Sequence, residues 1–189
     1  MSHDVVPASQ GSGPLLQRDY WAVLADYDGT PAQLMAHVKT NFCELPPEAL
    51  VRFDAPHGVA TGAELEIVIT PVQPCRVRVV HEDAQSITLG TLEGHPEAGR
   101  ITFGAYRNDN REVLFHIRSR ARSSSAVKLL GFLTVGEAMQ TNTWTDFINR
   151  TAASAGAHIR DVIHAQMETV EDEEDDSTVE SPTFLATGN

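Results

Sequence analysis

The chain has 189 residues, of which 41% are hydrophobic, and this length allows one compact core of about 100 to 150 residues plus some unstructured length. Its formal net charge of −12 argues against a nucleic-acid backbone as partner, because phosphate contacts need clustered lysine and arginine. No window approaches the roughly 18 uninterrupted apolar residues of a membrane span, so we expect none.

The sequence shows no sign of a metal, a cofactor or a secretion signal. Cys43 and Cys75 are isolated and lack C-x-x-C spacing, and the N-terminus has no basic region followed by an apolar stretch. His158 and His164 do not have the i, i+4 spacing of a helical metal site. We therefore expect a cytoplasmic protein with no metal and no cofactor.

Both ends of the chain differ in composition from its middle. Residues 1–13 are rich in proline, serine and glycine, which predicts a disordered leader. Residues 168–180 hold eight of the 26 acidic residues and no base, which leaves 18 acids against 14 bases elsewhere. We expect a single domain over 14–167 and a disordered acidic tail over 168–189.

The first half of the domain predicts one strand, one helix and two further strands. An apolar and aromatic run over 15–26 favours the first strand. Thr30 is a good N-cap with Pro31 at the first helical position, so a short amphipathic helix follows. Residues 48–53 are compatible with a helical turn or a strand. Alternation of apolar and polar residues then predicts two strands, 64–69 and 75–80.

The stretch over 86–121 predicts three consecutive strands. The turn Gly94-His95-Pro96-Glu97-Ala98-Gly99 follows the first, because glycine is free of β-carbon strain and proline fixes φ. The turn Asn108-Asp109-Asn110 follows the second. Short turns join antiparallel neighbours, so we expect a meander. After a short helix or linker over 126–133, the proline-free amphipathic run over 137–167 predicts one long helix.

These elements predict an α+β fold in which a curved antiparallel sheet of about six to seven strands packs on the long C-terminal helix. This order is similar to the helix-grip fold of the START and Bet v 1 superfamily (SRPBCC), whose members hold an apolar ligand between sheet and helix. The residues 13–24 and the turn Leu92-Glu93-Gly94-His95-Pro96-Glu97-Ala98-Gly99 resemble a family of uncharacterised bacterial and plant domains with a Leu-x-Gly-His-Pro-Glu-x-Gly turn. The resemblance covers residues 13–160 and implies the fold without an activity.

Resemblance and apolar alternation together favour binding of a hydrophobic small molecule, lipid-like or polyketide-like, in a pocket between the sheet and the C-terminal helix. Most aromatic residues of a domain this size must also fill its core. Trp144 suits a cavity wall because it combines bulk with an indole donor. The expected lining is Ile67, Ile69, Val77, Leu89, Phe103, Phe115, Trp144 and Ile148.

An alternative is an enzyme of the cyclase or hydrolase type, in which His95 or His116 transfers a proton and Glu97 sets the tautomer of His95. A structural role is the favoured interpretation of the turn, with Glu97 accepting turn amides. The sequence has no nucleophile elbow and no P-loop, so it does not decide whether the protein is an enzyme.

A third hypothesis is a protein-interaction module. His116, Arg118 and Arg120 alternate on the strand face opposite the apolar residues, and Arg122 extends this basic cluster. The cluster could bind an anion, a protein partner or the protein's own acidic tail, whereas a plain solvated strand face is the favoured alternative. The acidic tail offers a second surface for a protein partner.

Overall fold

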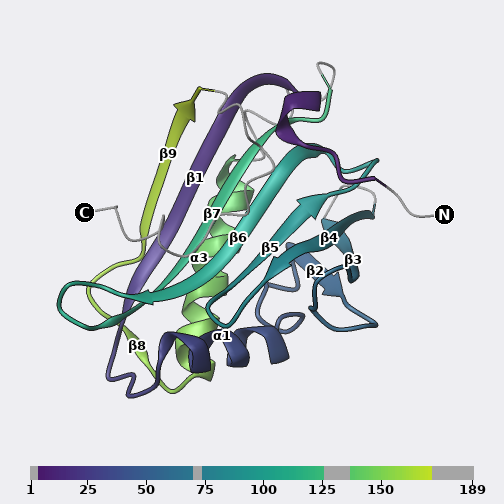
Figure 1. Cartoon of the computed structure of the whole chain (residues 1–189). Helices are drawn as coiled ribbons and strands as arrows, with labels where there is room; N and C mark the ends of the chain where they lie inside the picture. The colour runs from purple at the N-terminus through teal and green to yellow at the C-terminus, as the bar shows by residue number, and fades with distance from the viewer. Residues whose placement is uncertain (1–3, 70–73, 126–136, 172–189) are drawn as a thin grey trace.

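A computed structural model describes residues 4–69, 74–125 and 137–171, and within them shows one antiparallel sheet with two α-helices (Figure 1). The predicted α+β fold with a large antiparallel sheet is confirmed, although the sheet has nine strands rather than six or seven. The elements are η1 (Ala8–Gln10), β1 (Ser12–Ala25), α1 (Pro31–Thr40), β2 (Val51–Asp54), β3 (Glu64–Ile69), β4 (Cys75–Glu82), β5 (Ser86–Thr91), β6 (Glu97–Arg107), β7 (Val113–Ser123), α3 (Glu137–Ser154), β8 (His158–Ile159) and β9 (His164–Val170).

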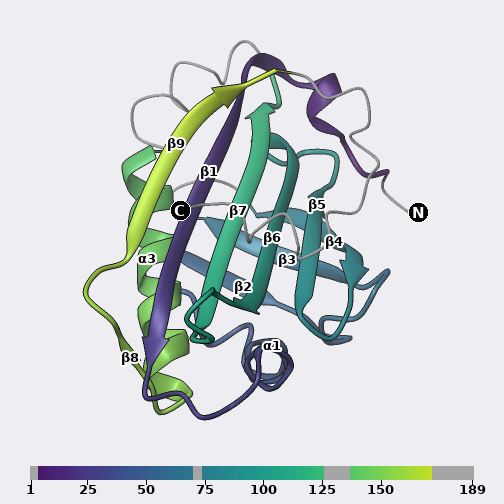
Figure 2. The same cartoon turned by 60° about the vertical axis from the view of Figure 1, so that its left-hand side comes forward.

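β1 connects the two halves of the sheet. Strands β2 to β7 form the predicted meander, in which each strand pairs with the next along the chain. β1 lies antiparallel to β7, with Trp21 opposite His116. Its other edge pairs with β9 from Leu15 to Trp21 and with the short β8 at Leu24. The first strand is therefore held between segments that come late in the chain (Figure 2).

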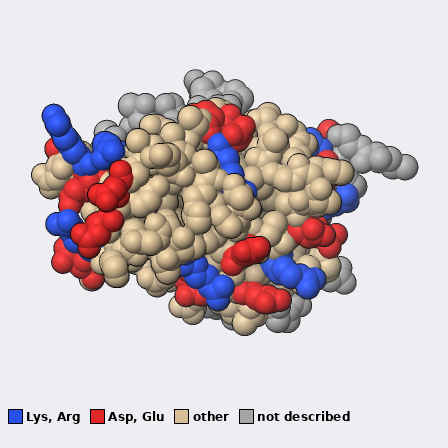
Figure 3. Space-filling model, turned by 90° about the horizontal axis from the view of Figure 1, so that it is seen from below, with Lys and Arg blue, Asp and Glu red and all other residues tan. Residues whose placement is uncertain are grey.

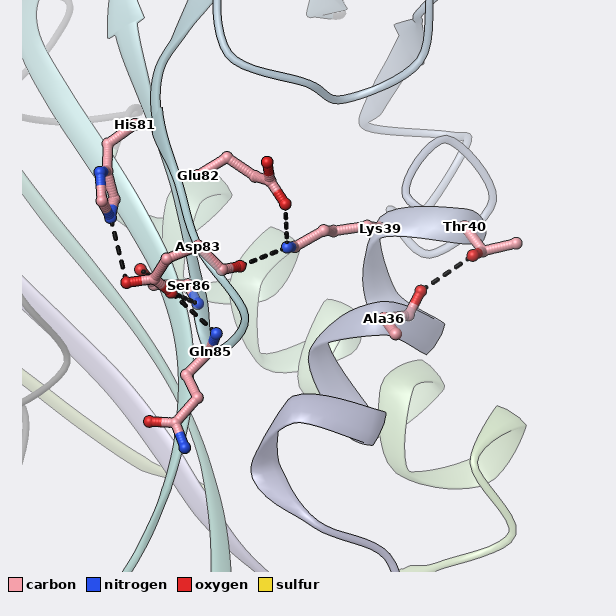
Figure 4. A network of polar contacts seen from close by, with 8 residues as sticks. All are labelled: Ala36, Lys39, Thr40, His81, Glu82, Asp83, Gln85 and Ser86. Atoms are coloured by element: carbon pink, nitrogen blue, oxygen red, sulfur yellow. Dashed lines mark hydrogen bonds and ion pairs between the residues drawn. The ribbon is translucent and has the colours of Figure 1, made fainter.

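α1 begins where the sequence predicts. The Gln33 amide donates to the Thr30 hydroxyl at 3.1 Å, and the Thr30 amide donates to the Gln33 side chain at 2.8 Å, which forms a capping box. Near the other end of the helix, Lys39 donates to the Glu82 carboxylate and to the carbonyl of Asp83 (Figure 4). These contacts fix α1 to the turn between β4 and β5.

α3 ends at Ser154, so the prediction of a helix to residue 167 is wrong. Gly156 has a φ of 73°, and its amide donates to the Ala153 carbonyl at 3.1 Å. The Ala157 amide donates to the Ala152 carbonyl at 2.9 Å. Together these form a Schellman motif, in which a left-handed glycine allows the last helical carbonyls to be satisfied. The chain then returns to the sheet as β8 and β9.

Both helices pack on the same face of the sheet, which we call the inner face. Alternate strand residues point to this face, and Phe147 of α3 packs against Phe103 of β6 and Phe115 of β7 at ring distances of 5.2 and 6.1 Å. Phe42, just after α1, joins the same cluster. The intervening strand residues form the outer face, on which neither described helix lies.

Two expectations about the chain ends need correction. Residues 4–11 are not a free leader, because the Val6 amide donates to the Thr91 carbonyl at 2.8 Å and Ala8 is buried. β9 continues to Val170, beyond the domain end expected at residue 167. The remainder of the predicted acidic tail, from residue 172, and the predicted helix or linker over 126–133 lie outside the described residues.

Candidate functional site

The inner face carries a buried charge near the first turns of α3. Arg18 of β1 alternates with the core residues Tyr20 and Ala22, and none of its surface is exposed. Its Nη1 lies 3.5 Å from Oε1 of Glu97, and the same oxygen accepts a hydrogen bond at 2.7 Å from Nε2 of Gln140. A buried ion needs such partners, because its desolvation costs several kcal/mol. We call Arg18, Glu97 and Gln140 the inner polar cluster, which joins the sheet to α3.

Small residues flank Arg18 on the inner face. Ser119 lies opposite Arg18, and Ala121 lies opposite Gly99. A Cβ at Gly99 would lie 2.2 Å from the Arg120 carbonyl oxygen, and φ is +148°, so glycine is required there. The lack of bulky side chains at these positions gives the long Arg18 side chain a path toward β6.

Four side chains of β7 and α3 bury a polar atom that has no hydrogen-bond partner among the described residues: Ser119 Oγ, Thr143 Oγ1, Trp144 Nε1 and Thr151 Oγ1. Trp144 lies one helical turn after Gln140, and its ring is 5.6 Å from that of Phe103. Its indole N–H can only donate, whereas a hydroxyl can donate and accept. Each buried unpaired group costs about 1–3 kcal/mol, so each of these atoms is a candidate for a hydrogen bond to water or to a ligand.

Most of the predicted pocket residues belong to the buried apolar cluster, and their role as a ligand lining stays a prediction. Six of them are buried in one apolar cluster: Ile67, Val77, Leu89, Phe103, Phe115 and Ile148. Ile69 and Trp144 are only partly buried at its boundary. Phe42 and Phe147 pack on Phe103, so aromatic rings occupy the part of the inner face near α1. Trp144 lies one helical turn after Gln140 of the inner polar cluster, and Phe103 packs against Trp144.

His95 and Glu97 have partners other than those expected. Nδ1 of His95 accepts a hydrogen bond from the Glu97 amide at 3.0 Å, and the histidine is buried in the turn. The Glu97 carboxylate is directed to Arg18 and Gln140. The expectation that Glu97 accepts turn amides is therefore wrong, because a histidine nitrogen has that role. Glu97 is the member of this pair that reaches the inner face.

His116 lies on the outer face in a chain of hydrogen bonds. Its Nε2 is 2.7 Å from Oδ1 of Asp19, and its Nδ1 is 3.2 Å from the Tyr106 hydroxyl. An ionised carboxylate only accepts, so Nε2 donates to Asp19 and, in the neutral ring, Nδ1 accepts from Tyr106. Burial raises the pKa of Asp19, but hydrogen bonds from His116 and Arg118 outweigh it and hold that pKa below its ordinary value. Burial raises the pKa of Tyr106 to about 12, so this hydroxyl stays a neutral donor.

The basic residues of β7 have partners on the outer face. Nε of Arg118 donates to the carboxylate that His116 also contacts, and Nε of Arg120 donates to Oε1 of Gln17 at 2.6 Å. Arg122 donates to a backbone carbonyl of β1. His116 is only 3% exposed, so the expectation of a plain solvated face is wrong for this residue.

Neither a metal site nor a membrane span occurs in the part of the chain that the structure describes. It contains no group of three or more histidine, cysteine, aspartate or glutamate residues that could hold a metal ion. Neither α1 nor α3 has the length and apolar character needed to cross a membrane. Cys43 is exposed and Cys75 is buried, and both are free thiols.

Sequence reasoning missed Arg18, Asp19 and Gln140 as site residues. For Arg18 the sequence contains a signal, because alternation places this charge on the face of β1 that carries Tyr20 and Ala22. Asp19 becomes informative only once β1 is paired with β7, which brings Asp19 opposite Arg118. Gln140 has no distinctive signal, since glutamine is ordinary on any helix face.

An antiparallel sheet packed on one face by a C-terminal helix is similar to the helix-grip fold. The family model described as Domain of unknown function (DUF1990) matches residues 32–150, and the chain belongs to that family. The match does not include β1, β8 or β9. No curated protein shows a significant match to the chain.

Solved structures of similar fold have very different sequences. The di-domain ARO/CYC StfQ from the steffimycin biosynthetic pathway is 10% identical with a TM-score of 0.54, over 75% of this chain and 51% of the StfQ chain. Protein CV1439 from Chromobacterium violaceum is 12% identical with a TM-score of 0.50, over 74% and 96% of the two chains. Ara h 8.0201 is 10% identical with a TM-score of 0.47, over 74% and 97%. The first two likenesses show the fold alone.

Proposed function

We propose that the protein binds a hydrophobic small molecule between the inner face of the sheet and the N-terminal half of α3. The apolar part of the ligand lies against Phe103 and Trp144, and its polar end lies beside Arg18 and Ser119. One observation carries the proposal: Ser119 Oγ and Trp144 Nε1 are buried without a partner among the described residues, and Arg18 is fully buried on the same face. A ligand that supplies acceptor atoms there would remove the cost of those unpaired donors.

The chemistry of these groups favours a ligand with oxygen acceptors. The guanidinium of Arg18 and the indole of Trp144 offer N–H donors and no acceptor. A lipid-like or polyketide-like molecule combines an apolar body with carbonyl or carboxyl oxygens, and therefore fits both halves of the site. StfQ, which is described as an ARO/CYC of a biosynthetic pathway, supports a small-molecule ligand for a fold of this kind.

The geometry gives less support to an enzyme that uses His95 or His116. The backbone of the turn engages Nδ1 of His95. His116 lies on the outer face, where Asp19 and Tyr106 engage both of its ring nitrogens. The bond of His95 is to the backbone amide of Glu97 and not to its carboxylate, and His116 is bonded on the outer face, so ligand binding is the function that the site supports best.

Native mass spectrometry of the protein purified from its own host tests the proposal directly, followed by extraction and identification of any bound molecule. The chain has two tryptophans, so the Trp21→Phe variant leaves Trp144 as the single reporter of the site. We expect a saturable change in Trp144 emission on titration with oleic acid or with an anilinonaphthalene sulfonate probe. An apo mass together with no saturable change for either probe contradicts the proposal.

A matched pair of substitutions locates the site. Ala121→Leu adds bulk beside Arg18 on the inner face and is expected to weaken binding at least about 10-fold, since about 1.4 kcal/mol corresponds to that factor. Ala165→Leu makes the same change on the exposed strand β9 and leaves binding unchanged. Circular dichroism establishes that both variants are folded. Equal binding by both variants places any ligand elsewhere.

A further inference from the structure

The outer face gathers positive charge in a chain that is acidic overall. Four arginines of β6 and β7 alternate onto this face: Arg100, Arg118, Arg120 and Arg122. Against them, two acids lie on this side of the neighbouring strands, Asp19 of β1 and Glu168 of β9. By contrast, on the surface viewed from below, acidic and basic side chains are interspersed (Figure 3). We call the four residues the outer arginine cluster.

One pair in this cluster places two positive charges opposite each other. Arg100 lies directly opposite Arg120 in the register of β6 and β7. Like charges that face each other across two strands destabilise a sheet. The same row continues through Gln17 to Glu168, whose carboxylate accepts a hydrogen bond from Gln17 Nε2 at 2.9 Å. The row therefore leads from β9 toward the opposed arginines.

The end of β9 brings an acidic sequence to this row. β9 ends at Val170, two residues after Glu168, and six consecutive acids follow at positions 171–176. Six extended residues span about 20 Å, whereas β6 lies three strand spacings from β9, about 14 Å. Segment 171–176 is therefore long enough to reach Arg100 from the end of β9.

We propose that the outer arginine cluster is a docking surface for an acidic peptide segment and that its occupant is the chain's own segment 171–176. The carboxylates lie at the opposed pair Arg100 and Arg120 and offset its repulsion. The docked segment thereby withholds the arginines from other anions. This proposal is independent of ligand binding on the inner face.

The test uses the full chain with the six acids at 171–176 replaced by their amides, which keeps length and shape but removes the charge. A fluorescein-labelled peptide of residues 170–181 is titrated against this neutralised chain and against the natural chain by fluorescence anisotropy. We expect at least about 10-fold tighter binding to the neutralised chain, from two or three exposed ion pairs, with the gain lost in 0.5 M salt.

Substitutions in the neutralised chain identify the surface. Arg100→Gln with Arg120→Gln is expected to abolish peptide binding, whereas Arg52→Gln, an exposed arginine on β2, leaves it unchanged. Circular dichroism checks that each variant is folded. Equal peptide affinity for the natural and neutralised chains would mean that the cluster is open to an external acidic partner, which overturns the proposal. Binding that survives loss of Arg100 and Arg120 overturns it as well.

Discussion

Asp19→Asn is expected to destabilise the protein by about 3 kcal/mol at pH 7. The side chain of Asp19 is 8% exposed, and it accepts hydrogen bonds from His116 and Arg118 and, at 3.0 Å, from Gln17 Nε2. Removing one partner of a buried ion pair costs about 3–5 kcal/mol, and asparagine keeps the size and one acceptor oxygen, which places the loss at the lower end. A loss of this size lowers Tm by about 6–12 °C in a protein of this length.

The pH dependence of this loss has a definite sign. The pKa of Asp19 is lower in the folded protein than its ordinary value, because its hydrogen bonds outweigh the effect of burial. Such a group stabilises the fold above the unfolded carboxyl pKa of about 3.9 and loses that contribution as pH falls through the folded pKa. The gap between natural chain and variant should therefore be constant from pH 7 to pH 5 and close below about pH 4.

Urea unfolding followed by circular dichroism at pH 7, 5 and 3.5 measures the gap. Asp146→Asn is the matched control, because Asp146 forms an exposed i, i+4 pair with Arg150 and should cost at most about 0.5 kcal/mol. A loss below about 1 kcal/mol for Asp19→Asn at pH 7, or a gap that stays the same at pH 3.5, refutes the reasoning.

Three further predictions concern stability and thiol chemistry. Gly99→Ala should lower the free energy of unfolding in urea by more than about 3 kcal/mol, because the added Cβ meets backbone atoms. Gly58→Ala has a positive φ but open space, so it should lower this free energy by only about 1 kcal/mol. Equal losses for the two variants would contradict this prediction. Thr30→Ala removes one half of a capping box and should cost about 1 kcal/mol, and Thr40→Ala at the end of α1 should cost less. A thiol reagent should label Cys43 in the native protein, and slowly, because burial raises the pKa of this thiol. The buried Cys75 should be labelled only in denaturant. Cys43→Ser should therefore abolish labelling of the native protein.

The meander and α1 could be predicted because local sequence decides them. Glycine and proline in the turns, alternation in the strands, and Thr30 before Pro31 each act over a few residues. The end of α3 was harder, since the small residues around Gly156 are compatible with a helix, and Ile159 and Val162 continue its apolar spacing. β9 gives no strand signal at all. Its side chains are exposed or nearly so on both faces, and it forms because β1 offers a backbone edge.

The candidate site likewise contains residues that local sequence predicts and residues that only long-range pairing brings together. The turn that contains Glu97 is visible in the sequence, but the direction of its carboxylate depends on Arg18 and Gln140, which are distant in sequence. His116 alternates onto a strand face that pattern analysis assigns to solvent. It is buried because pairing of β1 with β7 brings Asp19 beside it. Residues that act through long-range pairing cannot be assigned from local patterns.

The position of β1 in the sheet imposes an order on synthesis. β1 leaves the ribosome first among the strands, yet its partner β7 is made after β6, and β9 is made last. At about 5–20 residues per second, the nascent β1 waits on the order of seconds for β7, with the edges of a long apolar strand unpaired. Folding of the complete sheet is therefore a late event in translation. A chaperone would protect the unpaired edges of β1 mainly while the chain is still being synthesised.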